Sequence, residues 1–256
     1  MICLLLSSCG GGSSSSNASD NLITNGNWSI AASSKTSGLK LDIGGSLVQS
    51  GTSVTGIVHI TNSACFNYLS DDVQLSGSFV DNTLTLTSTA IRNQIVTITT
   101  TGTGNDMSGT YSITGGCADG DYGTLTAVYA PPITGTWTST YTDTGATVTA
   151  VATLTQAPTA DAHGRFPLTG TFVFAGSPCS TGGTIVSSTS SAVWGDRVTA
   201  AVTTNDVNGN QGALNYVATA TSNSTNTANP AMMSGGFQVT AGVCEGDSPF
   251  LQFSKQ

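Results

Sequence analysis

An internal repeat constrains the fold of this chain more than any other feature. The segment MSGTYSITGGC, residues 107–117, aligns with MSGGFQVTAGVC, residues 233–244, with one inserted residue before the second cysteine. Four further landmarks recur in the same order: Gly26-Asn27-Trp28 with Gly135-Thr136-Trp137, Leu47-x-Gln49 with Leu154-x-Gln156, Thr55-Gly56 before Cys65 with Thr169-Gly170 before Cys179, and Asp119-Gly120-Asp121 with Glu245-Gly246-Asp247. Landmarks that keep their order over this length indicate a duplicated module.

The repeat divides the chain into modules at residues 24–130 and 133–256. Pro131-Pro132 forms the joint, and two consecutive prolines predict that it is short and fairly stiff. The second copy has an insertion, PTADAHGRFP at residues 158–167, between its Gln and its Thr-Gly. We interpret this insertion as a longer loop between two strands.

The composition predicts an all-β fold. Charged residues make up 8% of the chain, well below the usual share, while apolar residues make up 38% and alternate with Thr and Ser. This alternation, interrupted by Gly, Asn and Asp, predicts about eight antiparallel strands in each copy. We expect two tandem small up-and-down barrels, with a pair of β-sandwiches as the alternative.

The position of tryptophan favours the barrel. An immunoglobulin-type sandwich has its Trp between the two cysteines, whereas Trp28 and Trp137 precede both cysteines of their copies. Gly-x-Trp on the first strand resembles the calycins, that is, the lipocalins and avidins. The resemblance covers three residues in each copy together with the strand count. It implies a barrel whose first-strand Trp closes one end.

Four cysteines occupy matching places in the two copies. Pairing Cys65 with Cys117 and Cys179 with Cys244 gives one disulfide in each module, which is typical of an exported protein. Each bond closes a loop of about 50–65 residues, which corresponds to roughly 4 kcal/mol in the chain-entropy model. No pair of cysteines has the close spacing of a zinc site, so we expect no bound metal.

The N-terminal stretch resembles the lipobox of bacterial lipoproteins. Leu6-Ser7-Ser8 precedes Cys9, and the Gly/Ser tract that follows has the composition of a flexible tether. The resemblance implies a signal peptide over residues 1–8, lipid on Cys9, and a tether over residues 9–23. Residues 1–8 contain no Lys or Arg, so we expect the true signal to begin upstream. A disordered N-terminus with an unmodified Cys9 is the alternative.

The lipobox resemblance also implies a location and a partner. It places the protein in the bacterial cell envelope, held to the membrane by the lipid anchor. Gly10 follows the cysteine where retained lipoproteins have Asp, which favours the outer over the inner membrane. A net charge of −8 argues against a nucleic-acid partner.

The sequence favours a non-enzymatic protein without a cofactor. It contains neither a nucleophile elbow nor a phosphate-binding glycine loop. His59 lies in a predicted strand and His163 in the inserted loop, at non-equivalent positions of different copies. A single strand histidine is more often structural than catalytic. We therefore expect no catalytic residues.

Several acidic residues fit turns better than ion sites. Asp71-Asp72 would point to opposite faces of a strand, so we interpret the pair as part of a turn. Asp206-Val207-Asn208-Gly209-Asn210 has the alternation of a calcium loop, but an Asn-Gly hairpin turn explains it better. Asp121 and Asp247 follow glycines at equivalent positions, where a tight turn is favoured over a ligand contact.

Two functions remain open. The first is non-catalytic binding of a small apolar or glycan ligand inside the barrels, by analogy with the calycins. Its candidate ligand-binding residues are the aromatic side chains at apolar strand positions: Trp28, Tyr111, Trp137, Phe172 and Phe237. The second is a structural or adhesive role at the surface, with filled barrels and an envelope protein or polymer as partner. An internal void of ~300 Å³ or more would favour the first.

Overall fold

The first eight strands form a closed barrel. The structure is a computed structural model that describes residues 22–143, 145–222 and 230–256. The strands are β1 (Gly26–Ser34), β2 (Lys40–Ser50), β3 (Ser53–Thr61), β4 (Val73–Val80), β5 (Thr83–Ser88), β6 (Ile95–Thr103), β7 (Asp106–Thr114) and β8 (Tyr122–Tyr129), with a short 3-10 helix, η1 (Gly116–Ala118), before β8. Each strand pairs antiparallel with the next, and β8 closes the ring by pairing with β1.

The second barrel has the same order of strands, except that two short strands together take the place of one strand. Its strands are β9 (Gly135–Asp143), β10 (Ala146–Gln156), β11 (Phe166–Ala175), β12 (Ser180–Ile185), β13 (Ala192–Trp194), β14 (Arg197–Asp206), β15 (Gln211–Ser222), β16 (Pro230–Ala241) and β17 (Phe250–Lys255). Both β12 and β13 lie between β11 and β14, at opposite ends of one strand position. Pairing of β17 with β9 and of β10 with β11 closes the ring.

The predicted all-β fold with two tandem up-and-down barrels is confirmed, and the sandwich alternative is wrong. Alternation gives each sheet one apolar face, which the closed barrel buries. In β5, for example, Leu84 and Leu86 are buried while Thr85 and Thr87 face outward. No helix among the described residues is long and apolar enough to cross a bilayer.

Equivalent hydrogen bonds make the duplication visible in the structure. The amide of Gly120 donates to the carbonyl of Ile113, and the amide of Gly246 donates to that of Val239. The tryptophans also correspond: the indole of Trp28 donates to the carbonyl of Thr24 at 2.8 Å, and that of Trp137 to the carbonyl of Ile133 at 2.9 Å. The two modules therefore share their turn and strand-entry geometry.

A separate hydrophobic core fills each barrel. The first includes Trp28, Leu47, Leu86 and Met107, all at most 1% exposed. The core of the second is richer in aromatic rings, and Phe172 packs against Phe237 with ring centroids 5.2 Å apart. Each barrel thus has its own source of hydrophobic stabilisation.

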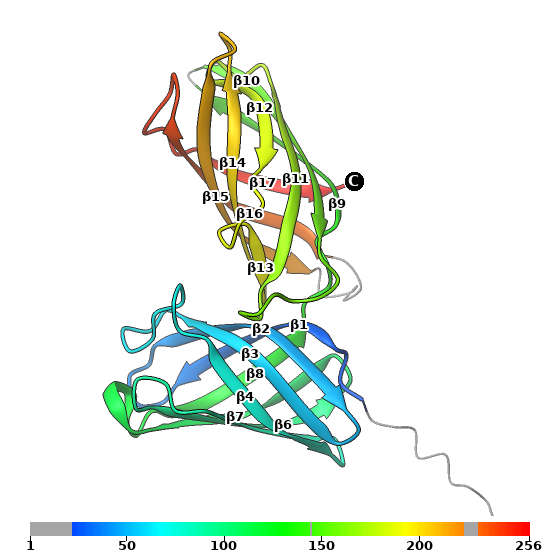
Figure 1. The fold of residues 1–256 in the computed structure, drawn as a ribbon, viewed down its shortest axis with the longest axis vertical. Coiled ribbons are helices and arrows are strands. Elements are labelled where there is room, and N and C mark those ends of the chain that lie inside the picture. The colour runs from blue at the N-terminus through cyan, green and yellow to red at the C-terminus, as the bar shows by residue number, and fades with distance from the viewer. Residues whose placement is uncertain (1–21, 144, 223–229) are drawn as a thin grey trace, which may run out of the picture.

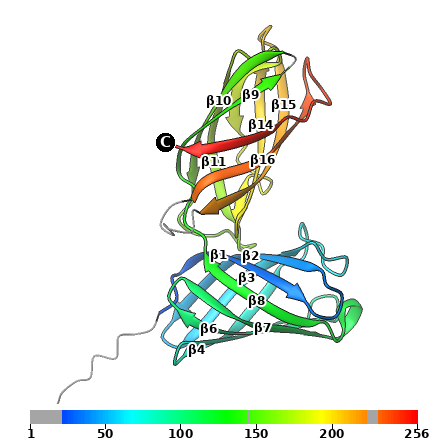
Figure 2. The ribbon, with the colours of Figure 1, turned by 180° about the vertical axis from the view of Figure 1, so that it is seen from behind.

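The two barrels meet end to side. One end of the second barrel, where β13 and the loop before β11 lie, rests on the wall of the first barrel formed by β1, β2 and β3 (Figure 1). The view from behind shows the same arrangement, with the chain passing from β8 into β9 beside this contact (Figure 2). The N-terminal end of β1 lies at this contact, where Asn27 bonds Gly195 of the second barrel.

Candidate functional site

The aromatic residues predicted to bind a ligand all lie in the barrel interiors. Trp28, Trp137 and Phe172 are at most 1% exposed, and Tyr111 and Phe237 are 3% exposed. The hydroxyl of Tyr111 donates to the carboxylate of Asp121 at 3.1 Å. Burial, together with this neighbouring carboxylate, raises the pKa of Tyr111 to about 12. These side chains belong to the two separate cores, and Phe172 and Phe237 pack against each other in the second.

Several clefts among the described residues lie on the outside of the barrels, at one barrel end and along the contact between the barrels. A cleft at the disulfide-bearing end of the second barrel, lined by Tyr141, Phe174 and Phe237, has a volume of about 30 Å³. That is about the share of one water molecule in the liquid and far below the ~300 Å³ of a ligand pocket. The larger depressions lie on outer strand faces and along the contact between the barrels.

The contact between the barrels is built around a glycine hairpin turn. Asn27 of β1 receives a hydrogen bond from the amide of Gly195 and donates one to its carbonyl, each at 2.6 Å. Gly195 has φ +59°, and a Cβ there would lie 2.9 Å from the Cα of Gly44. The turn between β13 and β14 therefore lies directly against the backbone of the first barrel.

The inserted loop of the second module is the other half of this contact. The carboxylate of Asp161 accepts the amides of His163 and Arg165, both at 2.9 Å, which holds the loop in a compact turn. Gly164 has φ +75°, and a Cβ there would lie 2.3 Å from the carbonyl oxygen of Ile57 on β3. The loop is thus longer, as predicted, and it docks on the first barrel.

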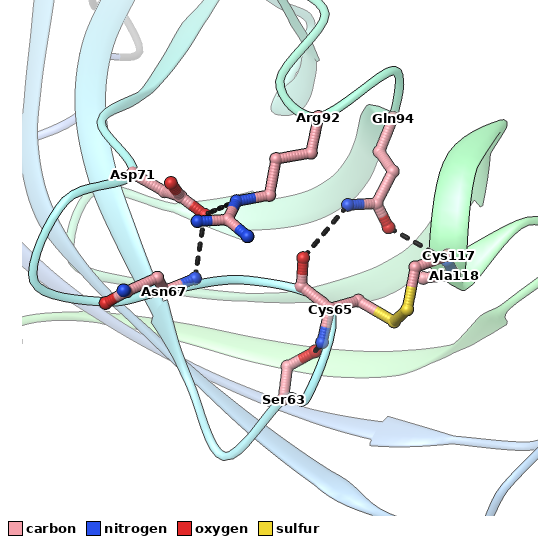
Figure 3. The surroundings of a disulfide bond; sticks show 8 residues. All are labelled: Ser63, Cys65, Asn67, Asp71, Arg92, Gln94, Cys117 and Ala118. Atoms are coloured by element: carbon pink, nitrogen blue, oxygen red, sulfur yellow. Dashed lines mark hydrogen bonds and ion pairs between the residues drawn. A yellow bond between two sulfur atoms is a disulfide. The ribbon is translucent and has the colours of Figure 1, made fainter.

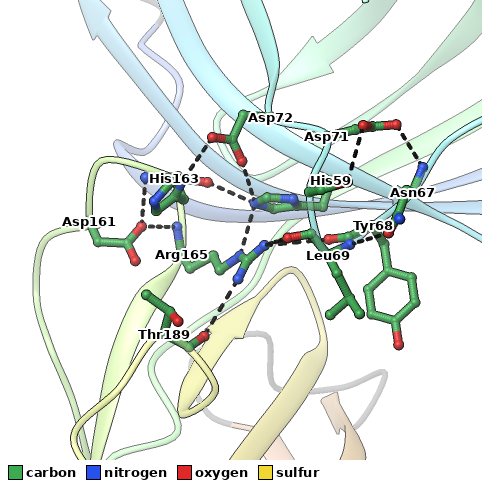
Figure 4. A network of polar contacts seen from close by, with 11 residues as sticks. His59, Asn67, Tyr68, Leu69, Asp71, Asp72, Asp161, His163, Arg165 and Thr189 are labelled. Carbon is green, nitrogen blue, oxygen red and sulfur yellow. Dashed lines mark hydrogen bonds and ion pairs between the residues drawn. The ribbon is translucent and has the colours of Figure 1, made fainter. Parts of the chain in front are cut away.

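This docking brings together the two histidines that the sequence places in different modules. The Nε2 of His59 lies 2.7 Å from the carbonyl oxygen of His163, and the Nδ1 of His163 lies 2.7 Å from the carboxylate of Asp72 (Figure 4). Side-chain exposure is 0% for His59, 28% for Asp72 and 49% for His163. A buried imidazole and a partly exposed hydrogen bond between His163 and Asp72 therefore join the modules.

The surroundings of His59 define its protonation state. Burial lowers the pKa of His59, and the charge of Arg165 acts in the same direction against the opposing effects of the His163 carbonyl and Asp72. The 2.7 Å contact requires a proton on Nε2, because a carbonyl oxygen only accepts. Nδ1 is buried without a partner among the described residues. The shorter contact decides the tautomer: Nε2 carries the proton and donates to the His163 carbonyl, so it cannot also accept from the Nε of Arg165 at 3.2 Å, and His59 is the neutral Nε2–H form.

Arg165 connects this histidine to the loop that follows β3. Its Nε lies 3.2 Å from the Nε2 of His59, and one terminal nitrogen donates to the carbonyl of Leu69 at 2.9 Å. Its guanidinium also lies 5.4 Å from the ring centroid of Trp194, which is within cation–π range. A buried arginine of the second module thus satisfies backbone carbonyls of the first.

The geometry of this cluster suits positioning better than catalysis. A general base must reach the proton that it removes, and the imidazole of His59 is inaccessible to a substrate. Its one donor is already engaged by the backbone of His163. We therefore treat the cluster as an interface.

The acidic residues predicted to form turns do so. Asp206 accepts the amides of Asn208 and Asn210, at 2.7 and 2.8 Å, and closes the hairpin between β14 and β15. Asp121 and Asp247 have equivalent backbone bonds, and the carboxylate of Asp121 also accepts the hydroxyl of Ser34 at 2.6 Å. Asp71 and Asp72 lie in the loop between β3 and β4.

Both predicted disulfides are present. Cys65 bonds Cys117 and Cys179 bonds Cys244, across 52 and 65 residues of sequence. Gln94 links the two sides of the first bond: it donates to the carbonyl of Cys65 and accepts the amide of Ala118 (Figure 3). Asp247 lies near the second disulfide, but the two sulfur atoms are bonded to each other and so offer no thiolate to a metal ion.

The ion pair next to the first disulfide is partly buried. Arg92 contacts the carboxylate of Asp71 at 2.6 Å, and the amide of Asn67 donates to the same group (Figure 3). Burial of Asp71 acts in the opposite direction, but these two contacts lower the pKa of its carboxyl. The loop between β3 and β4, which meets the second barrel, is thus held in a defined shape.

A scan against protein-family models and searches of the curated proteins and of the solved structures find no match to this chain. The functional interpretation therefore depends on the geometry alone. Cys9 and the predicted signal peptide lie outside the described residues.

Proposed function

We propose that the protein is a non-catalytic, lipid-anchored protein of the bacterial cell envelope, with a structural or adhesive role. The observation that supports this choice over a ligand container is the filled interior of both barrels. The aromatic side chains that would line a pocket are at most 3% exposed, and the cleft at the end of the second barrel holds about 30 Å³.

The outer face of the first barrel favours contact with a polar surface. Threonines on β5 lie opposite threonines on β6 in three successive pairs: Thr83–Thr101, Thr85–Thr99 and Thr87–Thr97. Neighbouring β7 and β8 continue the rows with Ser108, Thr110, Ser112, Thr124 and Thr126. This uncharged, hydroxyl-bearing sheet can exchange hydrogen bonds with water or with a hydroxylated polymer.

The docked barrels suit a structural or adhesive protein, because the outer faces of the two barrels keep a fixed orientation relative to each other. The Asn27–Gly195 bonds and the docked insertion supplement the proline joint, so the second barrel has a defined direction relative to the first. The tether before β1 would connect this body to the membrane. Gly10 after the cysteine favours the outer membrane over the inner one.

Native mass spectrometry of the unreduced, exported Cys9→Ala chain tests the choice between filled barrels and containers. The proposal predicts the mass of the bare chain with four fewer hydrogens, one pair for each disulfide. A stoichiometric small molecule that stays bound and is lost only on unfolding would overturn it.

Metabolic labelling with a fatty-acid analogue tests the anchor. We expect label on the wild-type chain and on Cys3→Ala, a matched control within the predicted signal, and none on Cys9→Ala. Equal labelling of Cys9→Ala and wild type would refute the lipid anchor.

A further inference from the structure

The contact between the barrels leaves a groove on one side that the interface itself does not use. It has a volume of about 430 Å³ and lies between Tyr68 and Leu69 of the first module and the outer faces of β14, β15 and β16. Trp194, Arg165 and Arg197 lie along it. Its volume is in the range of small-ligand sites, whereas the barrel interiors are filled.

Arg197 is the unusual residue of this groove. Its guanidinium lies 4.9 Å from the ring centroid of Tyr68 and 5.8 Å from that of Trp194, so two aromatic side chains hold it in place. Its Nε is buried without a hydrogen-bond partner, and no carboxylate of the described residues lies within 4.0 Å of the guanidinium.

Arg197 interacts electrostatically with the neighbouring Asp196 but forms no close ion pair with it. The chain has 14 acidic and 6 basic residues, so acidic partners for an arginine are abundant. Arg92, by comparison, pairs with Asp71 at 2.6 Å. The indole Nε1 of Trp194, next to Arg197 across the β13–β14 hairpin, is also buried without a partner. Both of these nitrogens lie beneath the surface of the groove, whereas Arg197 as a whole is only half-buried and its terminal nitrogens are not among the buried unpartnered atoms. The terminal nitrogens are therefore the part of the guanidinium that a ligand in the groove can reach.

The remaining lining is suited to a hydroxylated ring. Asn215 and Gln238 lie opposite each other on β15 and β16 and are exposed, so two amide side chains can donate to and accept from sugar hydroxyls. Thr189 and Ser190 add hydroxyls at the other edge of the groove. A fixed guanidinium beside these groups matches the planar carboxylate of an acidic sugar.

We propose that this groove binds a carboxylate-bearing sugar of the hexuronic acid class, as one residue or a short oligosaccharide. The overall charge of −8 favours a ligand with few carboxylates, because a long polyanion would be repelled by the rest of the surface. The inference deepens the proposed adhesive function and rests on it, since it names the chemistry of the partner and places it outside the barrels.

Isothermal titration of the disulfide-bonded chain with glucuronic acid tests the proposal. We expect saturable binding to the wild type, at least tenfold weaker binding to Arg197→Gln, and no saturable binding of glucose. Lys35→Gln removes the same charge from an exposed position outside the groove and should retain affinity within about twofold. Thermal unfolding of each variant shows whether it is folded.

A second variant separates sugar recognition from plain anion binding. Asn215→Leu should weaken glucuronate while leaving acetate and inorganic phosphate unchanged. Equal affinity for glucuronate, acetate and phosphate, equal affinity of Arg197→Gln and wild type for glucuronate, or no saturable binding of glucuronate to the wild type would each overturn the proposal. The mass-spectrometric test of the barrel interiors asks for a ligand that is lost only on unfolding. A sugar in this open groove can leave the folded chain, so the two tests can succeed or fail separately.

Discussion

At the scale of single residues, the contact between the barrels depends on positions where the two copies differ. Asn27 occupies the middle of Gly-Asn-Trp in the first copy, and Thr136 occupies the same place in the second. The asparagine amide has both a donor and an acceptor and so matches both backbone groups of Gly195, which a threonine hydroxyl cannot do in the same geometry. The interface therefore depends on a position at which the two copies differ.

Gly195→Ala tests this close backbone approach. We expect the variant to lose the fixed orientation of the barrels, because alanine at φ +59° costs roughly 1–2 kcal/mol and its Cβ would lie 2.9 Å from Gly44. Gly209→Ala is the matched control, since its φ is +83° and its Cβ would meet nothing within 4 Å. Thermal unfolding and small-angle scattering of both variants provide the comparison; equal effects would contradict the account.

The burial of neutral His59 predicts a pH dependence of stability. Its pKa is lowered from 6.5 in the folded chain, so below pH 6.5 the unfolded chain takes up a proton that the folded chain excludes. The free energy of unfolding should therefore fall as the pH drops below 6.5, by at most about 1.4 kcal/mol per pH unit for one proton. Denaturant titrations between pH 7.5 and pH 5 measure the slope.

His59→Gln supplies the reference for that measurement. Without the imidazole, the slope in this window should become smaller. A wild-type curve that is flat between pH 6.5 and pH 5, or a slope that the substitution leaves unchanged, would show that His59 is not responsible.

At the scale of elements, the strands were predictable from the sequence and the docking was not. Alternation of Leu with Thr in β5, and the recurrence of Trp28 as Trp137, are local signals that fix strands and barrel order. The contacts of Asn27 with Gly195 and of His59 with His163 join residues 168 and 104 apart, in segments without a common pattern. The clue to the docking was where the two copies diverge. They differ at the insertion 158–167 and at the strand position that β12 and β13 share.

The inserted loop should hold the orientation of the barrels without being needed for either one. Replacing residues 158–164 with a short Asn-Gly turn removes His163, Gly164 and the Asp161 carboxylate that shapes the loop. We expect each barrel to keep its strand content, as judged by circular dichroism, while the radius of gyration of the molecule increases. Loss of the folded second barrel would show that the loop is part of its core.

The disulfides should stabilise each barrel separately. A Cys179→Ser/Cys244→Ser chain should lose roughly 4 kcal/mol from the unfolding free energy of the second barrel in the chain-entropy model, because the bond spans 65 residues. The first barrel, whose bond and core are its own, should be nearly unaffected. Amide hydrogen exchange resolves the two barrels; uniform destabilisation of both would indicate one cooperative unit.

At the scale of the whole molecule, two filled barrels and a polar contact make one body whose larger depressions lie on the outside. The fold class, the duplication and the cysteine pairs followed from sequence because each rests on local or repeated patterns. The groove at Arg197 did not, since it exists only when the loop that contains Tyr68 meets the β13–β14 hairpin of the other module. A function at the junction therefore requires that the two barrels keep a fixed orientation relative to each other.

Residual dipolar couplings of backbone amides in the exported, disulfide-bonded chain test that central claim most directly. If the barrels form one body, a single alignment tensor will fit the couplings of β1–β8 and β9–β17 together, in the orientation set by the Asn27–Gly195 contact. Two tensors that differ in magnitude or direction would mean that the barrels move independently about the proline joint, and the account of a fixed groove between them would be wrong.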